Sequence, residues 1–322
     1  MNFRTVIDPP RHPGYLDHRQ HLLLLGSCFV ENLGAWLQQR KFDVDINPFG
    51  TLYNPESIAR NWERIVSGAP FTADDLCLSG GLWHSYDHHS RFSSPDRDSA
   101  LAHINHRLAA AHDRLPATDR IVVTWGSAYI YRINATGQVV ANCHKQPAST
   151  FTRELLAVDD IVARWLPIVR YIESTLPQCR LLFTVSPIRH LSDGAHGNQL
   201  SKATLLLAID RLQRESRICD YFPSYEILMD DLRDYRFYAD DLVHPSQQAQ
   251  QYIWELFTAA TLTEEALRKL PQVEAVTTAA GHRPLHPESD EYRRFCRKQL
   301  EIIESLPEID LSREKEFFNQ FL

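Results

Sequence analysis

Short apolar runs alternate along the chain with segments whose apolar residues recur every three or four positions. Three apolar runs have the length of buried strands: 22–25, 120–124 and 181–185. Residues 42–46 alternate as a further strand does, and five segments have helical spacing: 29–40, 57–66, 100–114, 158–176 and 199–216. Strands that alternate with amphipathic helices indicate an α/β fold, in which a mostly parallel sheet is covered on both faces as a three-layer sandwich.

The rest of the chain is organised around this core. Residues 129–133 and 138–141 are expected to form a hairpin about Thr136-Gly137, and 67–100 to be irregular. The last strand is placed within 221–228, and Pro245 is expected in the first turn of a helix. Beyond about residue 265, helices separated by Pro and Gly indicate an appendage. We therefore predict an α/β domain over 1–262 and a helical C-terminal extension, packed on it, over 263–322.

Composition narrows the function classes. The chain has 322 residues, 43% of them hydrophobic, and a net charge of −7, which argues against nucleic-acid partners and anionic membranes. No apolar run approaches the roughly 20 residues of a membrane span. The start lacks the apolar core of a signal peptide, so we expect a cytoplasmic protein. The six cysteines contain no CxxC pair, and free thiols are expected.

Gly26-Ser27-Cys28 lies where the first strand turns into a helix. Such a turn exposes a side chain above the sheet, and the helix N-terminus supplies N–H groups and positive potential. Both Ser27 and Cys28 are therefore candidate nucleophiles. The structural alternative is a tight turn with a serine N-cap and a buried cysteine.

Asp241-Leu242-Val243-His244 is a candidate general base. With two residues between them, the carboxylate can fold back onto Nδ1 of the imidazole and leave Nε2 to take a proton. The alternative is a helix cap beside a surface histidine. For an oxyanion hole we predict the N–H groups of Gly50 and of the nucleophile, with the side-chain amide of Asn142. Asn47 and Asn54 compete for that role, and turn formation is the alternative for each asparagine.

Several motifs in order resemble the GSCFA-domain family over most of the chain. The segments that carry the resemblance are Gly26-Ser27-Cys28-Phe29, with Val30 in place of the family's alanine, 47–55, 142–145, Ser186-Pro187, 235–238 and His244-Pro245-Ser246. That family is similar to the SGNH/GDSL hydrolases and acyltransferases. The resemblance implies a flavodoxin-like, SGNH hydrolase-like fold with a Ser–His–Asp triad and with Gly and Asn in the oxyanion hole.

The matching positions leave one choice open and show one departure. Counted without gaps from Gly26, the nucleophile position falls on Cys28, whereas a one-residue shift restores Ser27. The second and last SGNH blocks fall on Gly50 and on Asp241 with His244. The third block falls at Gly126-Ser127-Ala128-Tyr129, which lacks the asparagine, and Asn142 is the expected substitute.

Substrate-binding candidates complete the prediction. They are His88, in a loop with Trp83 and Asp87 that suits sugars, His144 and Lys145 beside Asn142, and Arg189, which with His190 and Lys202 could bind an anion. Structural roles are as compatible with each, and no metal or cofactor is expected. The predicted function is an esterase or O-acyltransferase acting on a small-molecule or glycan acyl substrate. The alternatives are a non-catalytic glycan- or partner-binding domain and a cysteine amidase or peptidase.

Overall fold

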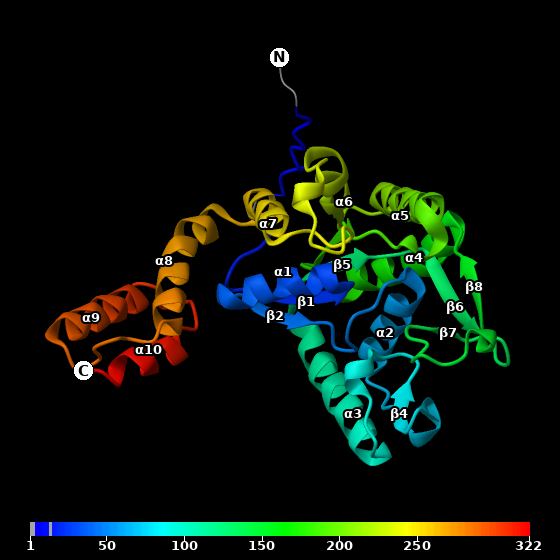
Figure 1. Cartoon of the computed structure of the whole chain (residues 1–322), viewed down its shortest axis with the longest axis horizontal. Helices are drawn as coiled ribbons and strands as arrows, with labels where there is room; N and C mark the ends of the chain where they lie inside the picture. Colours follow the sequence, from blue (N-terminus) through cyan, green and yellow to red (C-terminus); the bar gives the residue numbers. More distant parts are fainter. Residues whose placement is uncertain (1–3, 13–14) are drawn as a thin grey trace.

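A parallel five-stranded sheet forms the centre of the computed structural model, which describes residues 4–12 and 15–322 (Figure 1). Its strands are β1 (His21–Gly26), β2 (Asp43–Ile46), β5 (Thr118–Trp125), β9 (Arg180–Val185) and β10 (Cys219–Phe222). Their spatial order is β10-β9-β5-β1-β2, and every neighbouring pair is parallel. Numbered along the chain, this is the order 2-1-3-4-5 of flavodoxin-like folds. The predicted fold class is confirmed.

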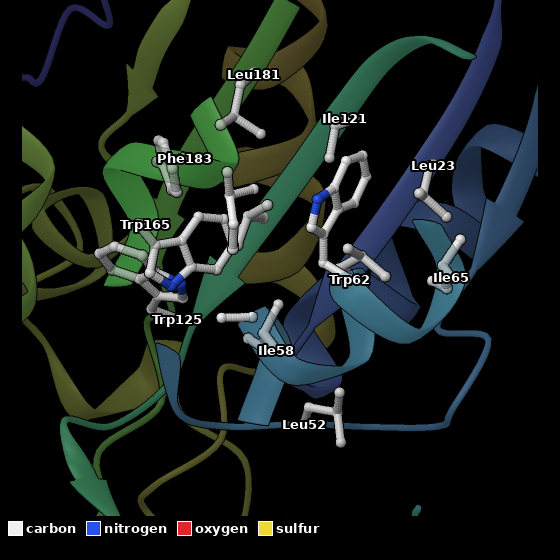
Figure 2. Close-up of a cluster of buried hydrophobic side chains, with 14 of the residues drawn as sticks. Leu23, Leu52, Ile58, Trp62, Ile65, Ile121, Trp125, Trp165, Leu181 and Phe183 are labelled. Carbon is white, nitrogen blue, oxygen red and sulfur yellow. The ribbon is translucent and has the colours of Figure 1, made fainter. Parts of the chain in front are cut away.

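Helices cover both faces of this sheet. α2 (Pro55–Ser67), α3 (Arg97–Arg114), α4 (Val158–Thr175) and α5 (Gly194–Glu215) pack on one face, and α1 (Cys28–Gln39) and α7 (Gln247–Thr261) on the other. The run of leucines in β1 serves both sides, because Leu23 and Leu25 face the first core while Leu22 and Leu24 face the second. Figure 2 shows the first core, where Trp62 and Trp165 lie over the strand residues.

Two small antiparallel sheets flank the core. One is the hairpin of β3 (Leu76–Ser79) and β4 (Leu82–Ser85), so the prediction that 67–100 is irregular is wrong there. The other joins β6 (Tyr129–Ile133) to β7 (Val139–Val140), as predicted, and to β8 (Phe151–Leu155), which the sequence analysis missed. Short 3₁₀ turns occupy Ala73–Asp75, Ser90–Phe92, Leu115–Ala117, Ala148–Thr150, Leu191–Asp193 and Tyr235–Phe237.

Two predicted boundaries near the end of the α/β core need correction. The last strand ends at Phe222, and the chain then becomes helical in α6 (Ser224–Glu226) and a π-helical turn (Ile227–Asp231), so the strand does not extend to 228. Pro245 is not in the first turn of α7. It lies before the N-cap Ser246, whose side chain accepts the N–H of Ala249.

Three further helices make up the C-terminal extension (Figure 1): α8 (Glu264–Gly281), α9 (Asp290–Glu304) and α10 (Ser312–Asn319). Ala266 at the start of α8 packs into the second core of the α/β unit, whereas Val273 and Val276 belong to a third core shared with α9 and α10. α8 thus contributes to both units, and the predicted boundary at 262/263 falls just before it. Residues 1–3 and 13–14 of the predicted domain 1–262 lie outside the described residues.

Ion pairs also join the extension to the C-terminal end of α1. Arg40 pairs with Glu274 and Lys41 with Glu314, each at 2.6 Å. Across residues 4–12 and 15–322, no helix combines the length and the apolar character that a bilayer span requires.

Candidate functional site

The turn from β1 into α1 depends on a glycine. Gly26 has φ +134°, and a Cβ atom there would lie 2.1 Å from the carbonyl oxygen of Thr124 in β5. The close approach lets the N–H of Ser27 donate to that oxygen (3.2 Å), while the N–H of Gly26 donates to Oδ1 of buried Asn47 (2.8 Å). Cys28 therefore begins α1 between the carboxyl ends of β1 and β5. This is the switch point of the strand order, where flavodoxin-like folds bind ligands.

The two candidate nucleophiles have different surroundings. Ser27 is 1% exposed, and its Oγ has no hydrogen-bond partner among the described residues, so it is not bonded to His244. Cys28 is partly exposed. Burial raises the pKa of the Cys28 thiol, the carboxylate of Glu31 raises it further, and the N–H groups of Cys28 and Phe29 and the Lys202 ammonium lower it. The thiol therefore needs a base to react at neutral pH, but its environment already contains groups that favour the thiolate.

The loop 47–54, which follows β2 in the chain, is hydrogen-bonded to the ends of both β1 and β5. The N–H of Leu52 donates to the carbonyl of Gly26 (2.9 Å), and the carbonyl of Tyr53 accepts the N–H groups of Gly126 and Ser127 (2.8 and 2.9 Å). The Tyr53 ring is therefore held near the turn. Its pKa is raised by burial and then by the nearby Cys28 and Glu31.

Two basic side chains stand at the carboxyl end of β9. His190 packs edge-on against Tyr53 with 5.6 Å between ring centroids, and burial, followed by the nearby Lys202, Arg153 and His244, lowers its pKa to about 4. Lys202 of α5 is 1% exposed, and its Nζ donates to the carbonyls of Gly126 (2.7 Å) and Ser186 (2.8 Å).

Asp241 and His244 form a hydrogen-bonded pair. Oδ2 of Asp241 lies 2.6 Å from Nδ1 of His244, and Oδ1 accepts the N–H groups of Val243 and His244, both at 2.9 Å. These N–H groups, and then the imidazole, lower the pKa of Asp241 to about 2. The His244 side chain is 52% exposed, and its imidazole is hydrogen-bonded to Asp241.

The predicted oxyanion donors are largely occupied. The N–H of Gly50 donates to the carbonyl of Asn47 at 2.8 Å and closes a turn, so the prediction that it is an open oxyanion donor is corrected. Asn47 is buried, and its Nδ2 donates to Oε1 of Glu31 (3.3 Å). Asn54 caps α2 by accepting the N–H of Ser57 (2.8 Å). Gly50, Asn47 and Asn54 thus make local hydrogen bonds that hold the loop 47–54 and begin α2.

A second polar cluster gathers around Ser85 and Ser90. Asn142 accepts the N–H of His144 (2.8 Å) and donates from Nδ2 to Oγ of Ser90 (3.2 Å). His144 is buried with Nε2 at 2.8 Å from the Ser85 carbonyl, and burial is the main reason that its pKa falls to about 4. Exposed Lys145 follows it in the left-handed region, with φ 56°.

Two predicted substrate-binding residues lie in other settings. His88 is 1% exposed, stacks on Phe49 (4.6 Å) and bonds through Nδ1 to Ser85 Oγ (2.8 Å), so its role is in the core and the predicted substrate contact is corrected. Arg189 contacts the sulfur of Met229 through Nε and Nη2 (3.1 and 2.9 Å). Among residues 4–12 and 15–322, no group of three or more His, Cys, Asp or Glu side chains is arranged to hold a metal ion.

Lys202 and the side chain of Tyr53 have a larger part in this geometry than the sequence pattern predicts. The burial of Lys202 could have been predicted from the sequence, because it shares a helical face with Leu205, Ile209 and Leu212, all buried. A lysine on an apolar stripe requires a reason. Tyr53 has no comparable signal in its local sequence, because its role depends on the strand ends that it bridges.

Comparisons with known proteins add independent information to this geometry. A search of curated proteins found no match. One solved structure with similarity is that of a carbohydrate esterase family 2 enzyme plus carbohydrate binding domain from Corynascus thermopiles (Myceliophthora fergusii). It is 17% identical over 47% of this chain, with a TM-score of 0.29, and this chain spans 38% of its length. The model of the GSCFA family matches residues 21–257, and that of the GSCFA domain protein, C-terminal domain, matches residues 273–322. The chain therefore belongs to the GSCFA family.

Proposed function

We propose that this protein is an esterase or acyltransferase that forms an acyl-thioester on Cys28, with the Asp241–His244 pair as its base. The observation that carries the proposal is the 2.6 Å hydrogen bond between Asp241 and His244. It orients the imidazole of His244, and the proposal requires Nε2 of this ring to reach the thiol of Cys28 at the start of α1. A nucleophile, a base and a residue that orients the base are the minimum set for covalent acyl transfer.

The chemistry follows from these groups. Nε2 of His244 takes the thiol proton, and Sγ of Cys28 attacks the ester carbonyl. The N–H groups at the start of α1 face the developing oxyanion. The C–O bond then breaks, and the leaving alcohol takes the proton from His244. Water or a second hydroxyl attacks the thioester with His244 again as base, which releases the acid or the transferred ester and restores the thiol.

Cys28 is preferred to Ser27 because of accessibility. A nucleophile must reach a carbonyl carbon, and Ser27 Oγ is buried without a partner, whereas Cys28 is partly exposed. The pKa of the Cys28 thiol, raised chiefly by burial, explains the need for a base.

The test combines labelling with turnover. Iodoacetamide adducts are mapped by mass spectrometry, and hydrolysis of p-nitrophenyl acetate is followed, for the wild type, Cys28→Ala, Ser27→Ala and His244→Ala. We expect turnover to be lost in Cys28→Ala and His244→Ala and retained in Ser27→Ala. Turnover that survives in folded His244→Ala contradicts the proposal, and turnover lost only in Ser27→Ala moves the nucleophile to Ser27.

The predicted carbohydrate acceptor has less support. Within the 83–90 segment, His84 and His88 are buried and Asp87 pairs with Arg60 (2.6 Å), so few of its polar groups remain for a sugar. We keep the carbohydrate as part of the proposal because Trp83 is partly exposed, with the Arg97 guanidinium 5.6 Å from its ring. Comparison of turnover between acetylated sugars and simple alkyl acetates tests this point.

A second candidate is a non-catalytic glycan- or partner-binding domain. It is favoured by the occupied N–H of Gly50 and by Ala128, which stands where the resemblance implies an oxyanion asparagine. This candidate predicts no turnover of any ester and no effect of His244→Ala on the labelling of Cys28. A cysteine amidase or peptidase would use the same groups, and amide substrates distinguish it from an esterase.

A further inference from the structure

Lys202 is a buried cation whose described hydrogen bonds go to neutral acceptors. It is 1% exposed, and its Nζ donates to the carbonyls of Gly126 (2.7 Å) and Ser186 (2.8 Å), which follow the adjacent strands β5 and β9. None of the ion pairs found among the described residues involves it. A buried charge without a counter-ion is costly, so its presence at the switch point calls for an explanation.

Cys28 and this ammonium both lie beside the end of β5. Gly26 of β1 pairs with Thr124 of β5, and Ser27, which precedes Cys28, donates its N–H to the Thr124 carbonyl (3.2 Å), two residues before Gly126. Adjacent strands are about 5 Å apart, and the Gly126 carbonyl is the one that holds Lys202. Burial lowers the pKa of Lys202 to about 7, and the nearby Cys28 raises it. Burial and then Glu31 raise the pKa of Cys28, and Lys202 is among the groups that lower it.

Other titratable groups surround the pair. Glu31 of α1 and Tyr53 of the 47–54 loop interact with Cys28. On the side of Lys202, His190 is close enough for the ammonium to lower its pKa, and the Tyr225 ring centroid lies 5.3 Å from Nζ. Glu31 is the carboxylate among these groups, and it opposes the thiolate, so Lys202 is the cation that offsets it.

We infer that Lys202 is a positioning residue for the proposed reaction, a fixed ammonium in the floor of the site that stabilises the Cys28 thiolate. The inference rests on the proposed function in treating that thiolate as the nucleophile. Because two strand-end carbonyls hold the ammonium in place, it needs no rearrangement when the thiol loses its proton to His244. A purely structural role, in which Lys202 only joins the ends of β5 and β9, would not change the titration of Cys28.

The test measures the pH dependence of Cys28 alkylation. Rates of iodoacetamide modification are followed by mass spectrometry over the range from about pH 6 to pH 10 in the wild type, Lys202→Met and Lys202→Arg. Cys77 and Cys143, also partly exposed, are internal controls within the same molecule. We expect Lys202→Met to react about tenfold more slowly at Cys28 near neutral pH, as a pKa raised by one unit requires, and to match the wild type at high pH. Lys202→Arg should lie closer to the wild type.

Superimposed Cys28 profiles for the wild type and folded Lys202→Met overturn the inference. If Lys202→Met does not fold, the reciprocal measurement decides: NMR titration of ¹³Cε-labelled lysine in Cys28→Ser. The pKa of Lys202 should fall from its wild-type value when the thiol is removed, and an unchanged value overturns the inference. A shifted Cys28 profile without ester turnover refutes the proposed function alone, whereas turnover that needs Cys28 with an unshifted profile refutes only the role of Lys202.

Discussion

Gly26 lies against Thr124 so closely that a Cβ atom on the glycine would be 2.1 Å from the threonine carbonyl oxygen. This contact joins β1 to β5 at the switch point and sets the direction in which the chain enters α1. The left-handed φ of Gly26 (+134°) adds a second demand that L-residues meet poorly. The position of Cys28 is thus set by the packing of the backbone at Gly26, two residues before it.

Gly26→Ala should therefore be strongly destabilising. We expect a loss of about 3 kcal/mol or more in the free energy of unfolding, measured with urea, because backbone atoms must shift to admit the methyl group. Gly137→Ala is the matched control, since Gly137 also has a positive φ (+74°) but no atom within 4 Å of a built Cβ. It should lose only about 1 kcal/mol. Equal losses in the two variants would contradict the role of the Thr124 contact.

Glu31→Gln should make Cys28 more reactive. Burial is the largest cause of the raised pKa of Cys28, and the Glu31 carboxylate is the next, so neutralising this residue lowers the pKa and increases the thiolate fraction at neutral pH. We expect iodoacetamide to label Cys28 several-fold faster at about pH 7.5. Glu63→Gln, on α2, is the control and should leave the rate unchanged. A slower reaction in Glu31→Gln would count against the assignment.

Asp241→Asn should impair turnover without unfolding the protein. The carboxylate is half-exposed and orients His244 through Nδ1. By analogy with other carboxylate–histidine pairs, we expect kcat/KM for p-nitrophenyl acetate to fall by about a hundredfold or more. The melting temperature should stay close to that of the wild type. Asp240→Asn is the neighbouring control, and equal losses of turnover in both variants would argue against the pair.

The same pair has a defined pH response. Since the N–H groups of His244 and Val243 lower the pKa of Asp241 to about 2, the carboxylate remains ionised well below the ordinary range of an aspartate. Any contribution of this carboxylate to stability is complete above its unfolded pKa and is lost as the pH falls through about 2. An NMR titration that finds Asp241 protonating near pH 4 would contradict the observed hydrogen bonds.

His88 should make the fold sensitive to mild acid. Burial lowers its pKa from 6.5 to about 3, so it stays neutral in the folded state while the unfolded chain binds a proton. Stability is therefore lost as the pH falls below about 6.5 and continues to be lost down to about 3. In His88→Leu, the difference in the free energy of unfolding between about pH 7.5 and pH 5 should be smaller by about 2 kcal/mol. An unchanged difference would show that His88 does not cause the acid sensitivity.

Much of the fold was predictable because the central strands are marked by local composition. The runs at 22–25, 120–124 and 181–185 have apolar residues on both faces. This pattern is typical of strands in a sheet that is covered on both sides. The strand β8, in contrast, lies in a small flanking sheet. Only Phe151 is buried, Arg153 and Glu154 are half-buried, and buried and exposed positions do not alternate regularly, so its pairing with β6 could not be predicted.

Local sequence also determined which segments carry reactive groups: the Gly-Ser-Cys turn, the Asp241–His244 spacing and the polar residues after each strand. Their accessibility was decided by tertiary structure, because burial depends on chain segments far away in sequence. Ser27 is buried and Cys28 is partly exposed, His88 is enclosed by aromatic rings, and the N–H of Gly50 is hydrogen-bonded within its own turn. Lys202 binds the carbonyls that follow β5 and β9 only because parallel pairing brings the ends of these two strands together.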